Sequence, residues 1–443
     1  MENGWQPIRV GVVGVGRGQS FARGAGPHLG MKLVALCDTW QERLRALGSE
    51  LDVATYTDYD RFLEHEMDAV VLANYFHQHA PFAIKALQAG KHVMSETAAC
   101  FTLAEGVALI EAVEQTAQTY LFAENYPYSR YNQEMRRLYL AGEIGEFRYG
   151  EGEYVHPFSA EGKNRIAPGY DHWRNWLPST YYNTHALAPI MFITETWPVA
   201  VNGFVVPWDR NDPQLTRTAR RGDVASMIAL RMDNGAVAKL LQGQLRGEGS
   251  WVRIHGNRGL MENLRIGQHG NRQQLRVYRQ AFDTEEGQGG ERIYLPDFPE
   301  FAASQALEPM AGLGALAARA GHGGGDFFTT FHFARAIRGE ERAFWDVYRG
   351  VAASIVGILA YRSALQGSNT VEVPDLRQEA VRDRYRDDHW SPDPTTRQPG
   401  DPWPSVLGDI RPSEEGLAYA QKVWAERGYV EGPGVRAGAG ATR

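Results

Sequence analysis

The sequence is poor in cysteine and has no excess of positive charge. It has 443 residues and two cysteines, Cys37 and Cys100, too few for a disulfide framework or a cysteine-based zinc site. Lysines and arginines number 46 against 53 aspartates and glutamates, so the formal net charge is −7. That balance favours neither nucleic acid nor an anionic membrane as a partner.

Long hydrophobic runs are missing as well. No apolar segment is long enough to cross a bilayer, and residues 1–5 lack the basic and apolar regions of a secretory signal. We therefore expect a cytoplasmic protein. The hydrophobic content is 43%, which is enough for two domains that each have a core.

The segment 8–18, Ile-Arg-Val-Gly-Val-Val-Gly-Val-Gly-Arg-Gly, has the pattern of a buried strand, a glycine turn and a helix start. The glycines Gly14, Gly16 and Gly18 let the backbone approach a pyrophosphate, and free N–H groups at a helix start bind phosphate oxygens. The third glycine position of G-x-G-x-x-G falls on Gln19, with Gly18 one place early. The pattern predicts a dinucleotide site, with an ordinary βαβ unit as the alternative.

A second strand, 33–38, ends in Asp38, where a carboxylate accepts hydrogen bonds from both hydroxyls of an adenosine ribose. A carboxylate there also repels a 2′-phosphate, so the sequence favours NAD over NADP as the cofactor. Arg17 lies in the turn and counts against the preference for NAD, because a cation there attracts the 2′-phosphate of NADP.

Strands and helices alternate up to about residue 125, as in a doubly wound parallel sheet. The predicted strands are 69–73, 92–94 and 120–123, and the predicted helices are 81–89, 103–116 and 131–140. The pattern then changes to strands at 147–155 and 201–205 and to two hairpins, 227–242 and 251–263. Further helices are predicted at 326–338 and 346–365.

The predicted fold class is α/β, with a Rossmann doubly wound parallel sheet in residues 1–125. Residues 126–375 form a second α/β domain with a largely antiparallel open sheet. Residues 376–443 form an extension rich in proline and charge, and its end, 432–443, is predicted to be disordered.

Separated motifs resemble the Gfo/Idh/MocA oxidoreductases: Ala-Leu-Gln-Ala-Gly-Lys-His-Val-Met-Ser-Glu at 86–96, Gly-Glu-Ile-Gly at 142–145, and the segment 346–374. The resemblance runs from about Val10 to Pro374. It implies a Rossmann domain, a sheet domain that carries the substrate, and NAD(P) between them. It also implies a homo-oligomer, a dimer or a tetramer, because the open sheet of that family usually packs against another subunit.

The chain departs from the dehydrogenases of that family. They usually follow the glutamate, here Glu96, with a Lys-Pro pair, and they place an aspartate four residues before a catalytic histidine. Here Thr97 and Ala98 replace the pair, and Tyr181 stands four residues before His185. Alcohol oxidation by lysine, aspartate and histidine is therefore undermined, and His185 alone is left.

The run 182–189, Tyr-Asn-Thr-His-Ala-Leu-Ala-Pro, resembles the Tyr-x-Thr-His-x-Leu-x-Pro motif of the NAD-dependent glycosidases that include α-N-acetylgalactosaminidases. Segments 124–125, 154–156 and 321–327 resemble the same branch. It implies a glycoside hydrolase that oxidises carbon 3 transiently, eliminates the group on carbon 1, adds water and returns the hydride. An NAD(P)-dependent sugar or polyol dehydrogenase is the alternative, and a non-catalytic sugar sensor is a third possibility.

That scheme gives roles to particular side chains. His185 takes the hydroxyl proton as hydride leaves, because an imidazole near its ordinary pKa is suited to neutral pH. Tyr154, if its neighbours acidify the phenol, or Tyr182 removes the proton from carbon 2. The implied cofactor contacts beyond the glycine turn are Asn74, His79, Glu96, Glu124, Trp173 and Arg174. Plainer interpretations stay open: packing aromatics for both tyrosines and a helix cap for Glu124.

The implied sugar contacts are His156, Arg165, Tyr170 and His322, although His322 also fits a role within its own glycine-rich turn. Arg165 and Lys163 add positive charge, which suits an anionic sugar with a carboxylate or sulfonate, or merely solvates a loop. A related group of NAD-dependent enzymes cleaves sulfoquinovosides. No metal is expected, because His77 and His79 have no acid or cysteine nearby.

Overall fold

Six short strands that are apolar almost throughout build a parallel sheet in the order β3-β2-β1-β4-β5-β6. Such runs are typical of strands with both faces covered, as in β4, where every residue is buried. The strand order reverses at β1, which pairs with both β2 and β4, and doubly wound sheets bind ligands at this switch point. The computed structural model describes residues 6–24, 26–247, 249–265, 273–281, 289–299 and 311–429.

The Rossmann half confirms the predicted alternation. Its strands are β1 (Ile8–Val13), β2 (Met31–Cys37), β3 (Ala54–Tyr56), β4 (Ala69–Leu72), β5 (His92–Ser95) and β6 (Tyr120–Phe122). Its helices are α1 (Gln19–Gly24), α2 (Gln41–Leu51), α3 (Tyr59–Leu63), α4 (His79–Gln88) and α5 (Leu103–Gln115). Asp58 and Thr102 begin α3 and α5, because their side chains accept the N–H groups of Arg61 and Glu105.

A second sheet has nine strands among the described residues, in the order β14-β13-β12-β11-β7-β10-β9-β8-β15. Its pairings are antiparallel except for β7 with β10, which confirms the largely antiparallel prediction. The strands are β7 (Phe147–Val155), β8 (Pro198–Val206), β9 (Ala225–Met232), β10 (Val237–Gly243), β11 (Gly249–Gly256), β12 (Gly259–Asn263), β13 (Leu275–Arg279), β14 (Gly290–Tyr294) and β15 (Val371–Glu372).

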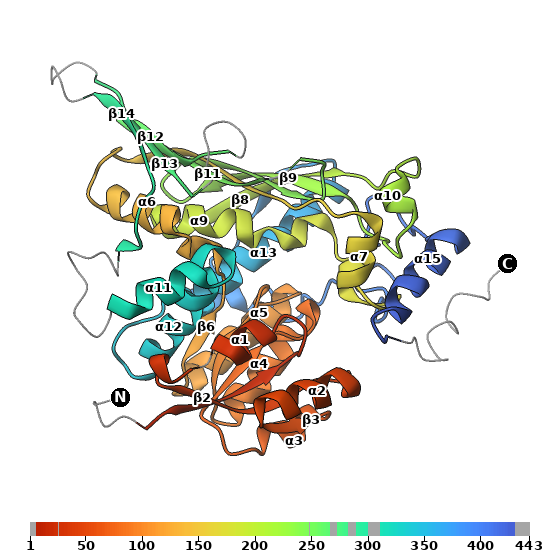
Figure 1. Ribbon diagram of the computed structural model, residues 1–443. Helices are drawn as coiled ribbons and strands as arrows, with labels where there is room; N and C mark the ends of the chain where they lie inside the picture. The colour runs from red at the N-terminus through yellow and green to blue at the C-terminus, as the bar shows by residue number, and fades with distance from the viewer. Residues whose placement is uncertain are drawn as a thin grey trace.

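Helices cover one face of this sheet, and Figure 1 shows α9 and α13 between the sheet and the Rossmann domain. The close approach depends on glycine: at Gly152 a Cβ would strike the carbonyl of Ala186 in α9, and at Gly203 the carbonyl of Ala360 in α13. The helices after β6 are α6 (Arg130–Leu140), α7 (Ala160–Ile166), α8 (Trp173–Trp176), α9 (Thr184–Thr194), α10 (Pro213–Thr216), α11 (Ala311–Arg319), α12 (Gly325–Ile337), α13 (Val347–Leu365), α14 (Glu379–Arg382) and α15 (Glu414–Ala425).

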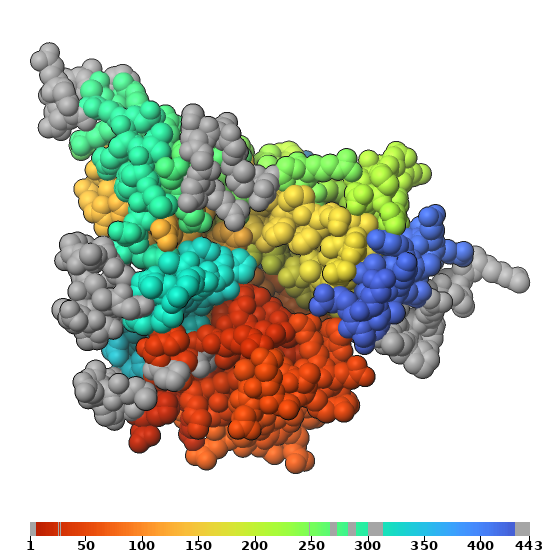
Figure 2. Space-filling model, in the orientation of Figure 1, coloured from red at the N-terminus to blue at the C-terminus, as the bar shows by residue number. Residues whose placement is uncertain are grey.

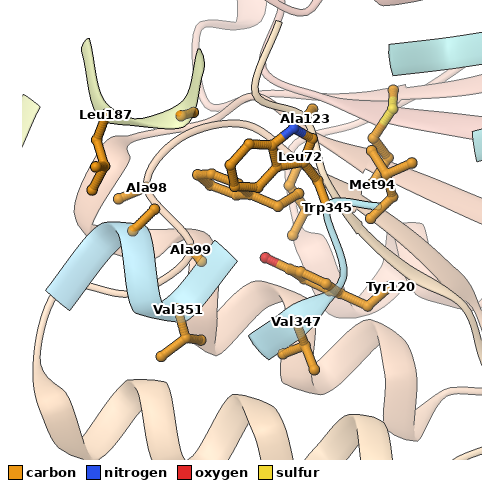
Figure 3. Close-up of a cluster of buried hydrophobic side chains, with 14 of the residues drawn as sticks. Leu72, Met94, Ala98, Ala99, Tyr120, Ala123, Leu187, Trp345, Val347 and Val351 are labelled. Carbon is orange, nitrogen blue, oxygen red and sulfur yellow. The ribbon is translucent and has the colours of Figure 1, made fainter. Parts of the chain in front are cut away.

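One continuous core joins the two halves. The Trp345 side chain is fully buried, and its carbonyl accepts the N–H of Phe122 in β6 at 2.8 Å. Figure 3 shows the indole among side chains of both halves, including Leu72, Met94, Tyr120, Leu187 and Val351. Because these apolar side chains are buried together, their packing fixes the position of the Rossmann strands relative to α9 and α13.

The C-terminal extension returns to the body of the molecule. Helix α15 lies beside α7 in Figure 1, and the indole Nε1 of Trp424 donates to the carbonyl of Asn164 at 3.1 Å. The segment 432–443, predicted to be disordered, lies outside the described residues. Within the described ranges, no helix combines the length and the apolar character that a membrane span needs.

Candidate active site

A cavity of about 410 Å³ lies between the Rossmann strands and the second domain. It brings together twelve side chains to which the sequence gives a role: Arg17, Asn74, His79, Glu96, Tyr154, His156, Lys163, Trp173, Arg174, Tyr182, His185 and His322. They come from segments up to 305 positions apart in the chain, from Arg17 to His322, and the sheet-to-sheet packing places them in one site.

The glycine turn after β1 lies at the Rossmann side of this cavity. Gly14 has a φ of 95°, and a Cβ there would strike the carbonyl of Ala73. Gly16 is exposed and has nothing within 4 Å of a Cβ position, whereas at Gly18 a Cβ would strike the Gly14 carbonyl. The turn therefore packs tightly against the sheet and presents bare backbone outward, as a pyrophosphate requires.

Asp38 supports the turn from the end of β2. One carboxylate oxygen accepts the N–H of Val15 at 2.7 Å, and the other accepts the N–H of Trp40 at 2.8 Å. The carboxylate is thus fixed beside the turn at the carboxyl end of the sheet, where ribose hydroxyls bind in this type of fold.

Two polar side chains at the cavity have atoms without a partner. The Asn74 side chain, after β4, has an amide nitrogen and oxygen that are both buried and unbonded among the described residues. Nδ1 of His79 contacts the carbonyl of Ala98 at 3.0 Å, while its Nε2 is buried without a partner, and burial lowers the His79 pKa. Because buried polar groups are costly without partners, these atoms fit a polar ligand such as NAD.

His185 is held from behind by a buried carboxylate. Its Nδ1 lies 2.6 Å from Oε1 of Glu124, whose side chain is fully buried. With Nδ1 donating to the carboxylate, Nε2 is the nitrogen that faces the cavity with a free lone pair. Glu124 is not among the residues that line the cavity, so the structure places it behind the histidine.

Three tyrosine rings surround this imidazole. The ring centroids of Tyr126 and Tyr154 lie 4.7 Å from that of His185, and the centroid of Tyr182 lies 5.0 Å away. Burial, followed by the neighbouring Tyr182, raises the pKa of Tyr154 well above its ordinary value, and only Arg174 acts in the opposite direction. The neighbours therefore do not acidify Tyr154, contrary to the condition that the sequence analysis attached to its role.

A network of charges closes the cavity on the glycine-turn side. The Arg17 guanidinium donates to Glu96 at 2.7 Å and to both oxygens of Asp326 at 2.9 and 2.6 Å. Asp326 also accepts from Asn125 at 2.9 Å and lies 3.0 Å from Nδ1 of His322. Burial alone would raise the Asp326 pKa, but the bonds from His322 and Arg17 hold it well below its ordinary value.

The opposite wall carries cations that form no direct ion pair among the described residues, although the carboxylate of Asp223 lies close enough to Arg220 to raise its pKa. Lys163 is buried, its Nζ donates to the carbonyl of Arg174 at 2.8 Å, and burial lowers its pKa well below the ordinary value. Arg220 donates to the carbonyl of Gly222 at 2.8 Å, and burial lowers its pKa to about 10. Within the described part of the chain, neither these two cations nor Arg174 forms an ion pair with a carboxylate.

Two predicted sugar contacts lie outside the cavity. Arg165 is exposed and pairs with Glu161 at 2.8 Å on the surface of α7. The ring of Tyr170 lies 4.1 Å beneath the guanidinium of Arg221. The structure thus brings His156 and His322 to the cavity but not these two side chains.

The sequence analysis did not assign Asp326 or Arg220 to the site. Asp326 belongs to the glycine-rich motif at 321–327 and lies in the first turn of α12. An acid at the start of a helix within that motif is the sequence signal that could have identified it. Arg220 lies in a loop after α10 with no recognisable pattern around it, and only the fold brings it to the cavity.

Comparison with known proteins identifies two domains of this chain. Residues 8–124 match the NAD-binding Rossmann fold of the Gfo/Idh/MocA oxidoreductase family, and residues 311–382 match the C-terminal domain of glycosyl hydrolase 109. A glycosyl hydrolase family 109 protein of Shewanella sp. (strain MR-4) is 27% identical over 84% of this chain and 86% of its own. An alpha-N-acetylgalactosaminidase of Shewanella oneidensis is 25% identical over the same shares.

Solved structures show the same fold. A levoglucosan dehydrogenase in complex with NADH and levoglucosan superposes with a TM-score of 0.69 at 20% identity, covering 83% of this chain and all of its own. An aldose-aldose oxidoreductase from Caulobacter crescentus has a TM-score of 0.62 at 20% identity, covering 83% and 99%. The chain is an enzyme that combines an NAD-binding Rossmann domain of the Gfo/Idh/MocA oxidoreductase type, in residues 8–124, with a glycosyl hydrolase 109 C-terminal domain, in residues 311–382.

Proposed function

We propose that the enzyme hydrolyses a sugar glycoside by transient oxidation at carbon 3, elimination, water addition and return of the hydride. The observation that carries this proposal is the composition of the cavity. Most enzymes that hydrolyse glycosides directly use two carboxyl groups flanking the scissile bond. Among the described residues that line the cavity the only carboxylate is Glu96, and Arg17 binds it. The same cavity holds a histidine beside an NAD site.

Bound NAD supplies an acceptor for a hydride and then a donor of the same hydride. As hydride leaves carbon 3, Nε2 of His185 accepts the hydroxyl proton, and Glu124 keeps the imidazole in the tautomer that can do so. The ketone at carbon 3 makes the carbon 2 hydrogen acidic. Tyr182 is the base that we propose for that proton, because burial raises the pKa of the alternative, Tyr154, well above its ordinary value. The bond from carbon 1 to the leaving oxygen breaks as the proton is removed.

The remaining steps run in the reverse sense, with water in place of the leaving group. Water adds its hydroxyl to carbon 1 as the tyrosine, whose phenol proton has exchanged with solvent, returns a proton to carbon 2. The proton that the water loses balances the one that the leaving oxygen takes up. Hydride returns to carbon 3, and His185 gives its proton back to the new hydroxyl. The balance is hydrolysis without net oxidation, so a tightly held cofactor serves many turnovers.

We further propose that the sugar is anionic and carries a carboxylate or a sulfonate. Lys163, Arg174 and Arg220 line the same cavity; burial lowers the Lys163 pKa, and the charges of Arg220 and Arg174 lower it further. Like charges that share a buried wall repel each other, and a bound anion relieves that repulsion. Arg165, which the sequence analysis used for the same argument, does not contribute to this wall.

A panel of neutral and anionic nitrophenyl glycosides, incubated with NAD, tests both proposals. We expect nitrophenol release without accumulation of reduced cofactor, and faster release from anionic glycosides. Net formation of reduced cofactor would support the dehydrogenase alternative instead, and neither signal would support a sugar sensor. Equal turnover of neutral and anionic glycosides would remove the anionic specificity while leaving the mechanism in place.

The open face of the nine-stranded sheet is the surface that we propose for self-association into a dimer or a tetramer. On β8, Gly203 faces α13, so the neighbouring Phe204 and Val206 point to the other side, where they are 44% and 40% exposed. Light scattering of the purified protein tests this, and a monomer would contradict it.

A further inference from the structure

Helix α15 is fixed to the second domain by its own apolar face. Ala420 and Trp424 form a small core with Ala219, separate from the main one. The Trp424 indole donates to the carbonyl of Asn164 in α7, and the Tyr419 ring lies 4.0 Å from the guanidinium of Arg217. In Figure 2 this segment, in blue, lies beside the yellow surface of the second domain.

The chain that follows α15 reaches the Rossmann domain. The ring of Tyr429 meets the ring of Trp40 edge to face, with centroids 5.8 Å apart. On its other side Tyr429 packs over Gly169 so closely that the glycine has no room for a Cβ. Tyr429 therefore contacts the second domain and the Rossmann domain at once.

In this type of fold the adenosine half of a dinucleotide binds beside the acid at the end of β2, so we expect the Tyr429–Trp40 contact to lie beside that half. The N–H of Trp40 donates to Asp38, whose other oxygen accepts from Val15 of the glycine turn. Tyr75 follows β4 on the other side of the switch point. Its pKa is raised by burial and, next, by the neighbouring Tyr429. A dinucleotide in this fold lies outside the carboxyl ends of these strands, between the segments that carry Trp40 and Tyr75.

We propose that Tyr429 and Trp40 form a latch that closes the adenosine end of the crevice and slows the release of NAD. The latch links the two domains across the crevice, so the cofactor leaves only when the aromatic contact opens. An enzyme that takes back its hydride in each turnover benefits from slow release; this last point alone rests on the proposed function.

The rate of cofactor dissociation from the full-length protein tests the latch without any glycoside. The protein is loaded with NADH, mixed with a large excess of NAD, and followed by the loss of NADH fluorescence. We expect Tyr429→Ala to release NADH about fivefold faster than the unmodified protein, because an aromatic pair is lost. Trp40→Ala should have a similar effect, and the double variant should add little, because both remove the same contact.

Tyr419→Ala is the matched control. Its ring lies against Arg217 of the second domain, whereas the contact with Trp40 is made by Tyr429, so NADH release should stay at the unmodified rate. Equal release rates for Tyr429→Ala and the unmodified protein would overturn the latch. An equal acceleration in Tyr419→Ala would also overturn it, because a general loosening of α15 would then be the cause. If Tyr429→Ala does not fold, Trp40→Ala alone decides.

Discussion

The two walls of the cavity differ in whether their cations form ion pairs. On the glycine-turn wall, Arg17 is matched by two carboxylates, Glu96 and Asp326, in ion pairs of 2.7 and 2.6 Å. On the opposite wall, Lys163 and Arg220 have hydrogen bonds to backbone carbonyls and no ion pair among the described residues. The paired wall has its charges matched without a ligand, whereas an anion would match the charges of the unpaired wall. In the function that we propose, the first wall serves structure and cofactor binding and the second wall binds the substrate.

The largest effect is expected at the histidine between the two walls. His185→Ala should lower kcat/KM for glycoside hydrolysis about 10³-fold, because it removes a group that both accepts and returns a proton. NAD affinity, measured by calorimetry, should change little. His255→Ala, on the open face of the sheet, is the control and should keep full activity. Near-normal hydrolysis by His185→Ala would exclude the histidine from the chemistry.

A variant of the paired wall separates structure from catalysis. Asp326→Asn should lower the free energy of unfolding by about 2 to 4 kcal/mol at neutral pH, because it leaves Arg17 half-matched in a largely buried site. The Asp326 pKa is depressed in the folded protein, so this stabilisation exists above the ordinary value of 3.8 and is lost as pH falls through the folded value.

Urea denaturation at neutral and acidic pH measures this difference. The unmodified protein and Asp326→Asn should differ at pH 7 and approach each other as the pH falls below 3.8. A constant difference across that range would show that the ionised carboxylate is not the source of the stability.

A variant of the unpaired wall should affect substrate choice. Lys163→Met should lower kcat/KM for an anionic glycoside about tenfold and leave a neutral glycoside almost unchanged. Arg165→Met is the matched control on the same helix, because Arg165 is exposed and pairs with Glu161. Equal losses on both glycosides, or an equal effect of the control, would contradict the assignment of this wall to an anion.

Lys163→Met should also remove a pH dependence of stability. Because the Lys163 pKa is lowered in the folded protein, the unfolded chain binds more protons between that lowered value and 10.5. The unmodified protein should therefore gain stability as pH rises through this window, and the variant should lack that gain. Denaturant titrations in steps from pH 7 to 10 measure it, and identical slopes would contradict it.

The two walls also differ in how far the sequence predicts them. The glycine turn and Asp38 are local features, since a strand, a turn and the next strand lie within about 30 residues. The pairing of Glu124 with His185 spans 61 positions and that of Arg17 with Asp326 spans 309, so only the packed sheets bring them together. No sequence motif surrounds Arg220, so the sequence predicted Lys163 as a cation for the substrate but not Arg220.

Helix geometry explains why Lys163 lines the cavity and Arg165 does not, although both were predicted to hold an anionic sugar. Lys163 and Arg165 are two positions apart on α7, so their side chains point about 200° apart around the helix axis. Lys163 faces the cavity and Arg165 faces solvent.

In the fold, the longer apolar strands and the strong hairpin turns were predicted from the sequence. The strand β3 was not, because three residues are too few to show an alternating hydrophobic pattern.

Hydrolysis in deuterium oxide tests the transient oxidation most directly. If a ketone at carbon 3 makes the carbon 2 hydrogen acidic during each turnover, the released sugar should carry deuterium at carbon 2, detected by NMR, while no reduced cofactor accumulates. Release of sugar that keeps its original hydrogen at carbon 2 would contradict the account, because hydrolysis would then proceed without oxidation of the ring.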